Sequence, residues 1–191
     1  MKKLIIACLF LSLFACGSKP PPETQYFVLT PSVISSTPDN KSLDKVLILE
    51  QIKIAKFLDQ PGIVMKTDSH QIQVAHYHRW AEPIRKNMYR YILETLSGSL
   101  SIPVVDEANN INDGSSVLSL IISVNKFNGA TDGTAVFSGE WLLIDKSTRS
   151  VKTKKSFNLK ANLESDGYTE LVNQLAKLVD KLCSDIASSL R

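Results

Sequence analysis

The second half of the chain carries the pattern that most limits its fold. Residues 117–127 and 135–144 are rich in apolar and β-branched side chains, and a glycine-containing segment, 128–133, separates them. This arrangement predicts two long strands joined as a hairpin. Residues 152–163 then alternate apolar and polar side chains, which is typical of an antiparallel strand with one exposed face.

A helix is predicted to close the chain over residues 166–190. Its apolar side chains recur every three or four residues as one stripe, which Val172, Val179 and Cys183 widen. The main members of the stripe are Leu171, Leu175, Leu178, Leu182, Ile186 and Leu190. Asp166 stands just before the pattern and is a candidate N-terminal cap.

Shorter elements are predicted in the first half. The strand candidates are residues 26–29, 46–54, 63–65, 72–78 and 102–105. Pro83 opens a second helix, where a missing N–H costs nothing, and Gly98 is its predicted stop. Together the elements predict an α+β fold, a mostly antiparallel sheet with two principal helices packed on it, in a single domain over residues 25–191.

The first fifteen residues have the organisation of a secretory signal. Lys2 and Lys3 precede an apolar run over residues 4–13, and the small Ala15 comes just before a cysteine. The run is too short to cross a bilayer, which needs about 20 apolar residues. Residues 1–15 are therefore predicted to be a signal peptide.

Cys16 follows the predicted cleavage site and resembles the cysteine of the bacterial lipobox, whose thiol is diacylated. We expect Cys16 to be the first mature residue and to hold the protein on a membrane through its lipid. Residues 16–24 contain three consecutive prolines and predict a semi-rigid tether. Phe14 is bulkier than the usual lipobox residue, and Cys8 is a competing site with too short an apolar core. An ordinary cleaved signal with an incidental cysteine is the alternative.

The net charge argues against a nucleic-acid partner, and the cysteine content argues against an internal disulfide. The formal net charge of +3 falls to +1 once Lys2 and Lys3 are removed, so a nucleic-acid partner is not expected. Without the signal, Cys183 is the one cysteine besides Cys16. The exported body therefore has no internal disulfide, and Cys183 is expected to be a buried thiol in the helical stripe.

The sequence lacks the common motifs of enzyme chemistry. It has no glycine-rich phosphate loop, no Gly-x-Ser-x-Gly elbow and no Cys-x-x-Cys pair. The acidic and amide side chains of residues 106–113 lack the spacing of a calcium loop and predict a polar loop. We therefore expect no catalytic residues, no cofactor and no enzymatic activity.

His76 and His78 lie on one face of the strand predicted at residues 72–78. Two such imidazoles can ligate zinc or copper if a third ligand converges. The alternative, a polar face of an exposed strand, is favoured, so no metal site is predicted.

Residues 79–84 have the sequence Arg-Trp-Ala-Glu-Pro-Ile, between a predicted strand and a predicted helix. This motif resembles the ABC-type transport auxiliary lipoproteins of the PqiC/YmbA family. Further segments resemble the same family in order along the mature chain, namely residues 26–29, 54–64, 124–127 and 139–141. The chain departs from the family pattern at two positions. Phe14 is unusual for a lipobox, and Gln60 stands where the family commonly has arginine.

The resemblance implies an outer-membrane lipoprotein whose body faces the periplasm. It also implies an MCE-domain partner that carries lipid between the two membranes, and a ring-forming homo-oligomer. Gly17, in place of an aspartate after the lipidated cysteine, favours the outer membrane by the same resemblance. Two alternatives stay open: a monomeric outer-membrane assembly or lipid-chaperone lipoprotein, and a periplasmic metal-binding or hydrolytic protein that uses His76 and His78.

Trp80, Glu82 and Pro83 are the candidate interface residues. Trp80 offers a large, rigid apolar surface at the strand-to-helix corner, and Glu82 can complement the positive end of the helix dipole. Trp80 is either a core residue or an anchor for a neighbouring subunit or partner, where tryptophan is enriched.

Overall fold

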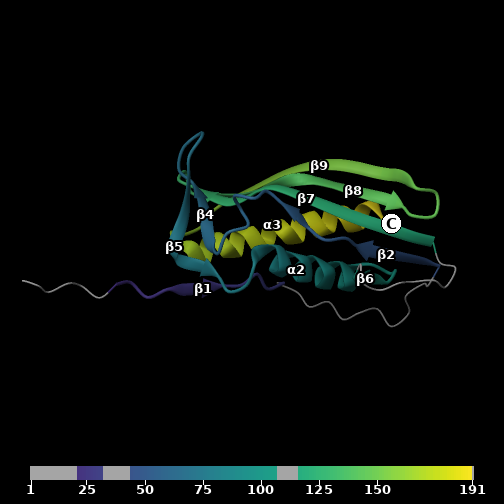
Figure 1. The fold of residues 1–191 in the computed structure, drawn as a ribbon, viewed down its shortest axis with the longest axis horizontal. Coiled ribbons are helices and arrows are strands. Elements are labelled where there is room, and N and C mark those ends of the chain that lie inside the picture. Colours follow the sequence, from purple (N-terminus) through teal and green to yellow (C-terminus); the bar gives the residue numbers. More distant parts are fainter. Residues whose placement is uncertain (1–20, 32–43, 107–115, 191) are drawn as a thin grey trace, which may run out of the picture.

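The computed structural model describes residues 21–31, 44–106 and 116–190, and these form one body with nine strands and two helices (Figure 1). The strands before the first helix are β1 (Gln25–Phe27), β2 (Lys45–Leu49), β3 (Lys53–Ile54), β4 (Gly62–Lys66) and β5 (Ile72–Trp80). Then come α2 (Ile84–Ser99), β6 (Val104–Asp106), β7 (Ser116–Ala130), β8 (Thr134–Asp145), β9 (Ser150–Asn162) and α3 (Tyr168–Ser189). The predicted α+β fold is confirmed.

The predicted hairpin and the alternating strand after it form the antiparallel meander β7–β8–β9. Gly133 makes the first turn possible, because its φ of 77° lies in the left-handed region that favours glycine. The turn is supported by Asp132, whose Oδ1 accepts a hydrogen bond from the Thr134 N–H at 3.1 Å. Along β8 every second side chain faces the helices, and Phe137 and Trp141 are fully buried there.

The opposite edge of β7 organises the rest of the sheet. Three short strands, β2, β3 and β4, pair with it one after another, and all three run parallel to it. β6 continues the sheet beyond β2, while β5 and then β1 continue it beyond β4. The long pairings are therefore antiparallel, as predicted, and the short ones, apart from β4–β5, are parallel.

Both helices pack on one face of the sheet (Figure 1). The α3 stripe is buried from Leu171 to Ile186, as its periodicity predicts, and Cys183 lies within it as a free thiol whose pKa is raised by burial. The two helices are joined by Tyr91, whose hydroxyl donates to Asp180 Oδ1 at 2.7 Å. The space between helices and sheet is filled by apolar side chains.

Several local predictions were wrong in detail. Residues 46–54 form two strands, because the backbone leaves regular pairing after Leu49 and regains it only at Lys53. Gly98 does not stop α2, which continues to Ser99. Asp166 does not cap α3, because the cap position belongs to Gly167, whose φ of 116° suits glycine and which has no side chain to cap with.

Candidate interface at the β5–α2 corner

The chain turns sharply between β5 and α2. Hydrogen bonds hold the corner on two sides: the Trp80 N–H donates to the Pro61 carbonyl at 2.7 Å, and the Ala81 N–H donates to the Phe27 carbonyl at 2.8 Å. Pro83 has no N–H to donate, and at the start of a helix this missing donor costs nothing. Pro83 lies just before the first helical residue, and its carbonyl accepts the Lys86 N–H at 2.9 Å.

Trp80 points into the core from this corner. It is 6% exposed, and its ring centroid lies 6.1 Å from that of Phe127. This burial agrees with the core alternative of the sequence analysis. An anchoring role for Trp80 toward another protein stays a prediction.

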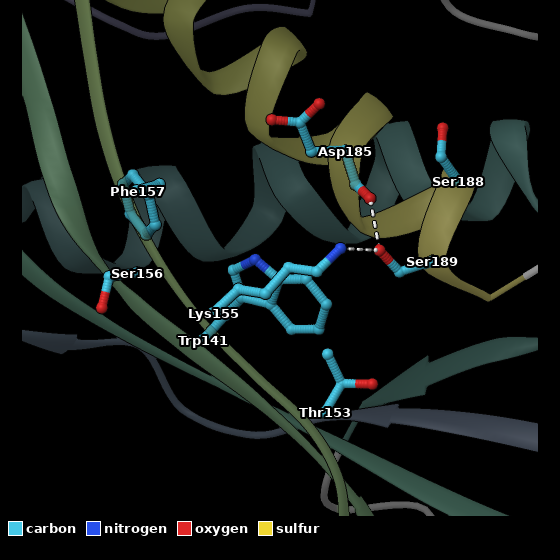
Figure 2. A pocket seen from close by; sticks show the side chains of 8 residues that line it. All are labelled: Trp141, Thr153, Lys155, Ser156, Phe157, Asp185, Ser188 and Ser189. Atoms are coloured by element: carbon cyan, nitrogen blue, oxygen red, sulfur yellow. Dashed lines mark hydrogen bonds between the residues drawn. The ribbon is translucent and has the colours of Figure 1, made fainter.

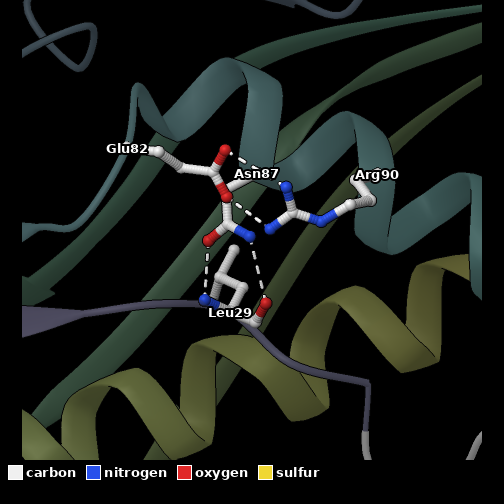
Figure 3. A network of polar contacts seen from close by, with 4 residues as sticks. All are labelled: Leu29, Glu82, Asn87 and Arg90. Atoms are coloured by element: carbon white, nitrogen blue, oxygen red, sulfur yellow. Dashed lines mark hydrogen bonds and ion pairs between the residues drawn. The ribbon is translucent and has the colours of Figure 1, made fainter.

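Glu82 lies at the surface of the corner and forms an ion pair with Arg90, two helical turns further along (Figure 3). Both carboxylate oxygens accept a hydrogen bond from the guanidinium, one of them at 3.2 Å from Nη1. The carboxylate raises the pKa of Arg90. Each side chain keeps part of its surface open to solvent. The carboxylate therefore binds Arg90, and no side-chain hydrogen bond caps the N-terminus of α2.

Asn87 is the residue that the sequence analysis missed. It is fully buried, and its amide makes two hydrogen bonds to the backbone of Leu29, in the segment that follows β1 (Figure 3). The amide therefore fixes the N-terminal segment to α2. One feature of the sequence could have indicated it. The amide at position 87 is three residues after Ile84 and four before Tyr91, so it falls in the apolar stripe of the helix, where a buried amide needs hydrogen-bond partners.

Two surface grooves flank the corner, with volumes of about 560 and 460 Å³. Both are lined by Glu82, Pro83 and Arg85. Arg85 is held between them by Asp59, with its Nη2 2.6 Å from Oδ2. Two of the three candidate interface residues, Glu82 and Pro83, therefore lie where another protein can reach them.

The two histidines have aromatic neighbours. His78 stacks on Tyr168 at the start of α3, with ring centroids 4.0 Å apart, and His76 meets the ring of Tyr77 edge-on. Within the described part of the chain, no group of three histidine, cysteine, aspartate or glutamate side chains is placed to hold a metal ion.

A third groove, of about 610 Å³, lies between β9 and the last turns of α3 (Figure 2). Trp141 forms its floor, and Lys155 extends across that ring to donate a hydrogen bond to Ser189 Oγ at 2.9 Å. The rim includes Asp185, Ser156 and Ser188 as well. Such a polar rim is a poor match for a lipid acyl chain.

Cys16 and the predicted signal peptide lie outside the described residues. Among the helices that are described, none is long and apolar enough to cross a membrane.

The chain is similar to known proteins in both sequence and fold. Residues 27–187 match the family described as the ABC-type transport auxiliary lipoprotein component. The chain is 29% identical to the intermembrane transport lipoprotein PqiC of Escherichia coli K12, an alignment that covers all of this chain and 98% of that protein. PqiC of Shigella flexneri matches with the same identity and coverage.

Two crystal structures have a similar fold. One, of an uncharacterized protein, has 25% identity and a TM-score of 0.75, covering 89% of this chain and all of that one. The other, from Xanthomonas campestris, has 18% identity and a TM-score of 0.69, covering 85% of this chain and 92% of that one.

Proposed function

This chain belongs to the family of ABC-type transport auxiliary lipoprotein components, and we propose that it is an accessory lipoprotein of an intermembrane lipid transport system. The family consists of transport components and is non-enzymatic. In the proposal, Cys16 carries the lipid, the anchor lies in the outer membrane, and residues 25–191 form the working domain in the periplasm.

The observation that carries this proposal is the similarity to PqiC along the whole chain. The alignment includes the predicted signal peptide and Cys16, and it continues through every strand and helix described. An alignment that spans both the predicted leader and the body supports a shared role more strongly than one over the body alone.

The partner we propose is an MCE-domain protein of the periplasm, which would meet a ring of these subunits. The β5–α2 corner is the proposed contact, either between subunits or with that partner. Glu82 and Pro83 line both grooves there, and Arg85 and Arg90 offer hydrogen-bond donors beside them. Arginine is enriched at protein–protein interfaces, which supports a role in protein recognition.

A monomeric assembly factor or lipid chaperone is the competing function. The experiment that separates the two is a pull-down of the lipidated protein from native membranes, read by mass spectrometry, together with light scattering in detergent. We expect an MCE-domain protein among the captured partners and a mass of several subunits. A protein that stays monomeric at micromolar concentration with its lipid attached would contradict the ring and favour the competing function.

A further inference from the structure

Exposed apolar side chains gather on one end of the molecule. Of the six large hydrophobic residues that are exposed in the described part of the chain, four belong to β5 or to the segment that contains β1. They are Tyr26 (65% exposed), Val28 (45%), Ile72 (46%) and Val74 (42%). Because β1 and β5 are neighbouring strands, these side chains form one surface only if they point the same way.

The strand register places Tyr26 and Val28 on the side away from the helices. β1 runs parallel to β5, with Phe27 opposite Trp80 and Tyr26 opposite Arg79. Trp80 points into the core, so Tyr26 and Arg79 point outward. Val28 follows the same alternation, since the next residue along is buried.

At the start of β5, the side chains of Ile72 and Val74 also point away from the helices, because the β4–β5 pairing has a register shift. The Met65 side chain lies on the helix side of the sheet, near Leu171. Its neighbour Lys66 therefore faces the opposite side. Ile72, the strand partner of Lys66, and Val74, two residues further along, face that side as well. From the pair Val64–Val74 to the pair Gly62–Arg79, β4 moves by two residues and β5 by five. Paired residues point to the same side of a sheet, and Val64 and Gly62 share one side of β4, so Val74 and Arg79 also share a side. Ile72 and Val74 therefore face the same side as Tyr77 and Arg79. We call these six residues, Tyr26, Val28, Ile72, Val74, Tyr77 and Arg79, the β1–β5 outer face.

Tyr26, in this face, is joined to the proposed anchor by a short length of chain. Nine residues separate Cys16 from Tyr26, so the two are at most about 35 Å apart even when the chain is extended. The chain cannot swing away from the body at Tyr26, because β1 is paired with β5 and Asn87 holds Leu29. In Figure 1 the described N-terminal segment accordingly enters at the end that carries β4 and β5.

The chemistry of the β1–β5 outer face suits the boundary of a bilayer. Tyrosine is enriched at the headgroup level, where its ring is half in an apolar layer and its hydroxyl is hydrated. Aliphatic side chains contribute burial, and cations are attracted to lipid phosphates, here Arg79 within the face and Lys66 beside it on β4. We propose that this face rests on the phospholipid headgroups of the membrane that carries the anchor. The choice of a membrane as the occupant rests on the proposed lipidation of Cys16.

The test uses the chain from Cys16 onward, with the Cys16 thiol coupled to a maleimide-bearing phospholipid. Cys183 is buried and does not compete for the reagent. Single tryptophans are introduced as Tyr26→Trp, Ile72→Trp and Gln25→Trp, and their fluorescence is measured on vesicles of phosphatidylethanolamine and phosphatidylglycerol with and without brominated acyl chains. Gln25→Trp is the matched control, because Gln25 is exposed beside Tyr26 but lies on the other side of β1.

We expect Tyr26→Trp and Ile72→Trp to lose most of their added fluorescence on brominated vesicles, while Gln25→Trp keeps it. The two native tryptophans are buried and supply a constant background. Equal quenching at all three positions would mean mere closeness to the tether, and no quenching would mean that the face does not touch lipid. Tryptophan emission that shifts to shorter wavelength without quenching by brominated lipid would mean that a protein, such as a second copy, covers the face. Each of these results overturns the proposal. Because the lipid is attached chemically, the result is independent of whether cells modify Cys16.

Discussion

Asn87 and Leu29 are 58 positions apart in the chain and are joined by two hydrogen bonds. The Leu29 N–H donates to Asn87 Oδ1 at 2.6 Å, and Asn87 Nδ2 donates to the Leu29 carbonyl at 3.0 Å. The side-chain amide thus does for Leu29 what a neighbouring strand would do for a strand residue. It allows the N-terminal segment to continue past the end of β1 into a buried position without losing its backbone hydrogen bonds.

Asn87→Ala is expected to destabilise the domain by about 3 kcal/mol, because it leaves a buried N–H and a buried carbonyl of Leu29 without partners. Chemical denaturation measures this loss. Limited proteolysis should also show faster cleavage within residues 21–31. Asn158→Ala, at an exposed position of β9, is the matched control and should change neither. An unchanged denaturation midpoint for Asn87→Ala would mean that water replaces the amide.

The elements that the sequence predicts well are those with a repeated pattern. The α3 stripe and the β7–β8 hairpin each repeat a periodicity over ten or more residues, and both were found where predicted. The parallel pairings of β1, β2 and β3 could not be predicted, because they depend on which distant segments meet along β7 and β5. Short strands carry too few side chains to specify a neighbour.

In the candidate site, too, the local backbone could be predicted from the sequence and the side-chain partners could not. The motif that singled out Trp80, Glu82 and Pro83 correctly marked a strand-to-helix corner, since proline has a fixed backbone preference there. The partner of Glu82 could not be read from the helix dipole alone, because Arg90 offers a charge-assisted bidentate contact two turns away. Asn87 was passed over because an amide within an apolar stripe has no distinctive pattern of its own.

Leu178→Asp is expected to destabilise the domain by at least about 3 kcal/mol or to unfold it, since it buries an unpaired charge between α3 and the sheet. Leu178 is a buried member of the α3 stripe. Thermal melting measures the effect. Lys181→Asp, on the exposed side of the same helix, changes the helix charge without entering the core and should melt close to the parent. Equal melting of the two variants would place the stripe against solvent or a partner.

Asp145 is expected to make stability depend on pH in the acid range. Its carboxylate accepts hydrogen bonds from the Ser147 side chain and the Thr148 N–H, and Lys152 lies nearby, so the pKa of Asp145 is held well below its usual value. A depressed folded-state pKa contributes stability above the unfolded pKa of about 3.9 and loses it as the pH falls toward the folded pKa.

Asp145→Asn should therefore lower the free energy of unfolding at pH 7, and its deficit relative to the parent should shrink as the pH is lowered below about 4. Urea denaturation at a series of pH values measures both. Ser147→Ala, which removes the leading cause of the shift, should reproduce part of the same pH dependence. A deficit that stays constant down to the acid limit would show that the carboxylate contributes through packing alone.

Cys16→Ser is expected to abolish lipid attachment. The reason is the apolar core before Ala15 and the Ala15-Cys16-Gly17 junction, which predict processing at this cysteine. The variant should accumulate as a larger precursor and take up no labelled palmitate, whereas Cys183→Ser, at a buried thiol, should label like the parent provided that it folds. Unchanged size and labelling of Cys16→Ser would place the modification elsewhere.

Glu82→Arg is expected to weaken self-association or partner capture while costing the fold about 1 kcal/mol or less, because the Glu82–Arg90 pair is partly exposed to solvent. Light scattering, the pull-down and thermal melting measure the three effects. Glu140→Arg is the matched control: it breaks a similarly exposed pair with Lys154, away from the corner, and should leave mass and partners unchanged.

The double variant Glu82→Arg with Arg90→Glu tells apart the two ways in which Glu82 could act. It restores an ion pair within the subunit but inverts both charges that an incoming protein would meet. If the corner is the interface, the double variant melts like the parent and still fails to associate, since complementarity across an interface depends on the sign of each charge. Recovery of association would mean that Glu82 only shapes the corner, and an unaffected single variant would place the interface on another surface.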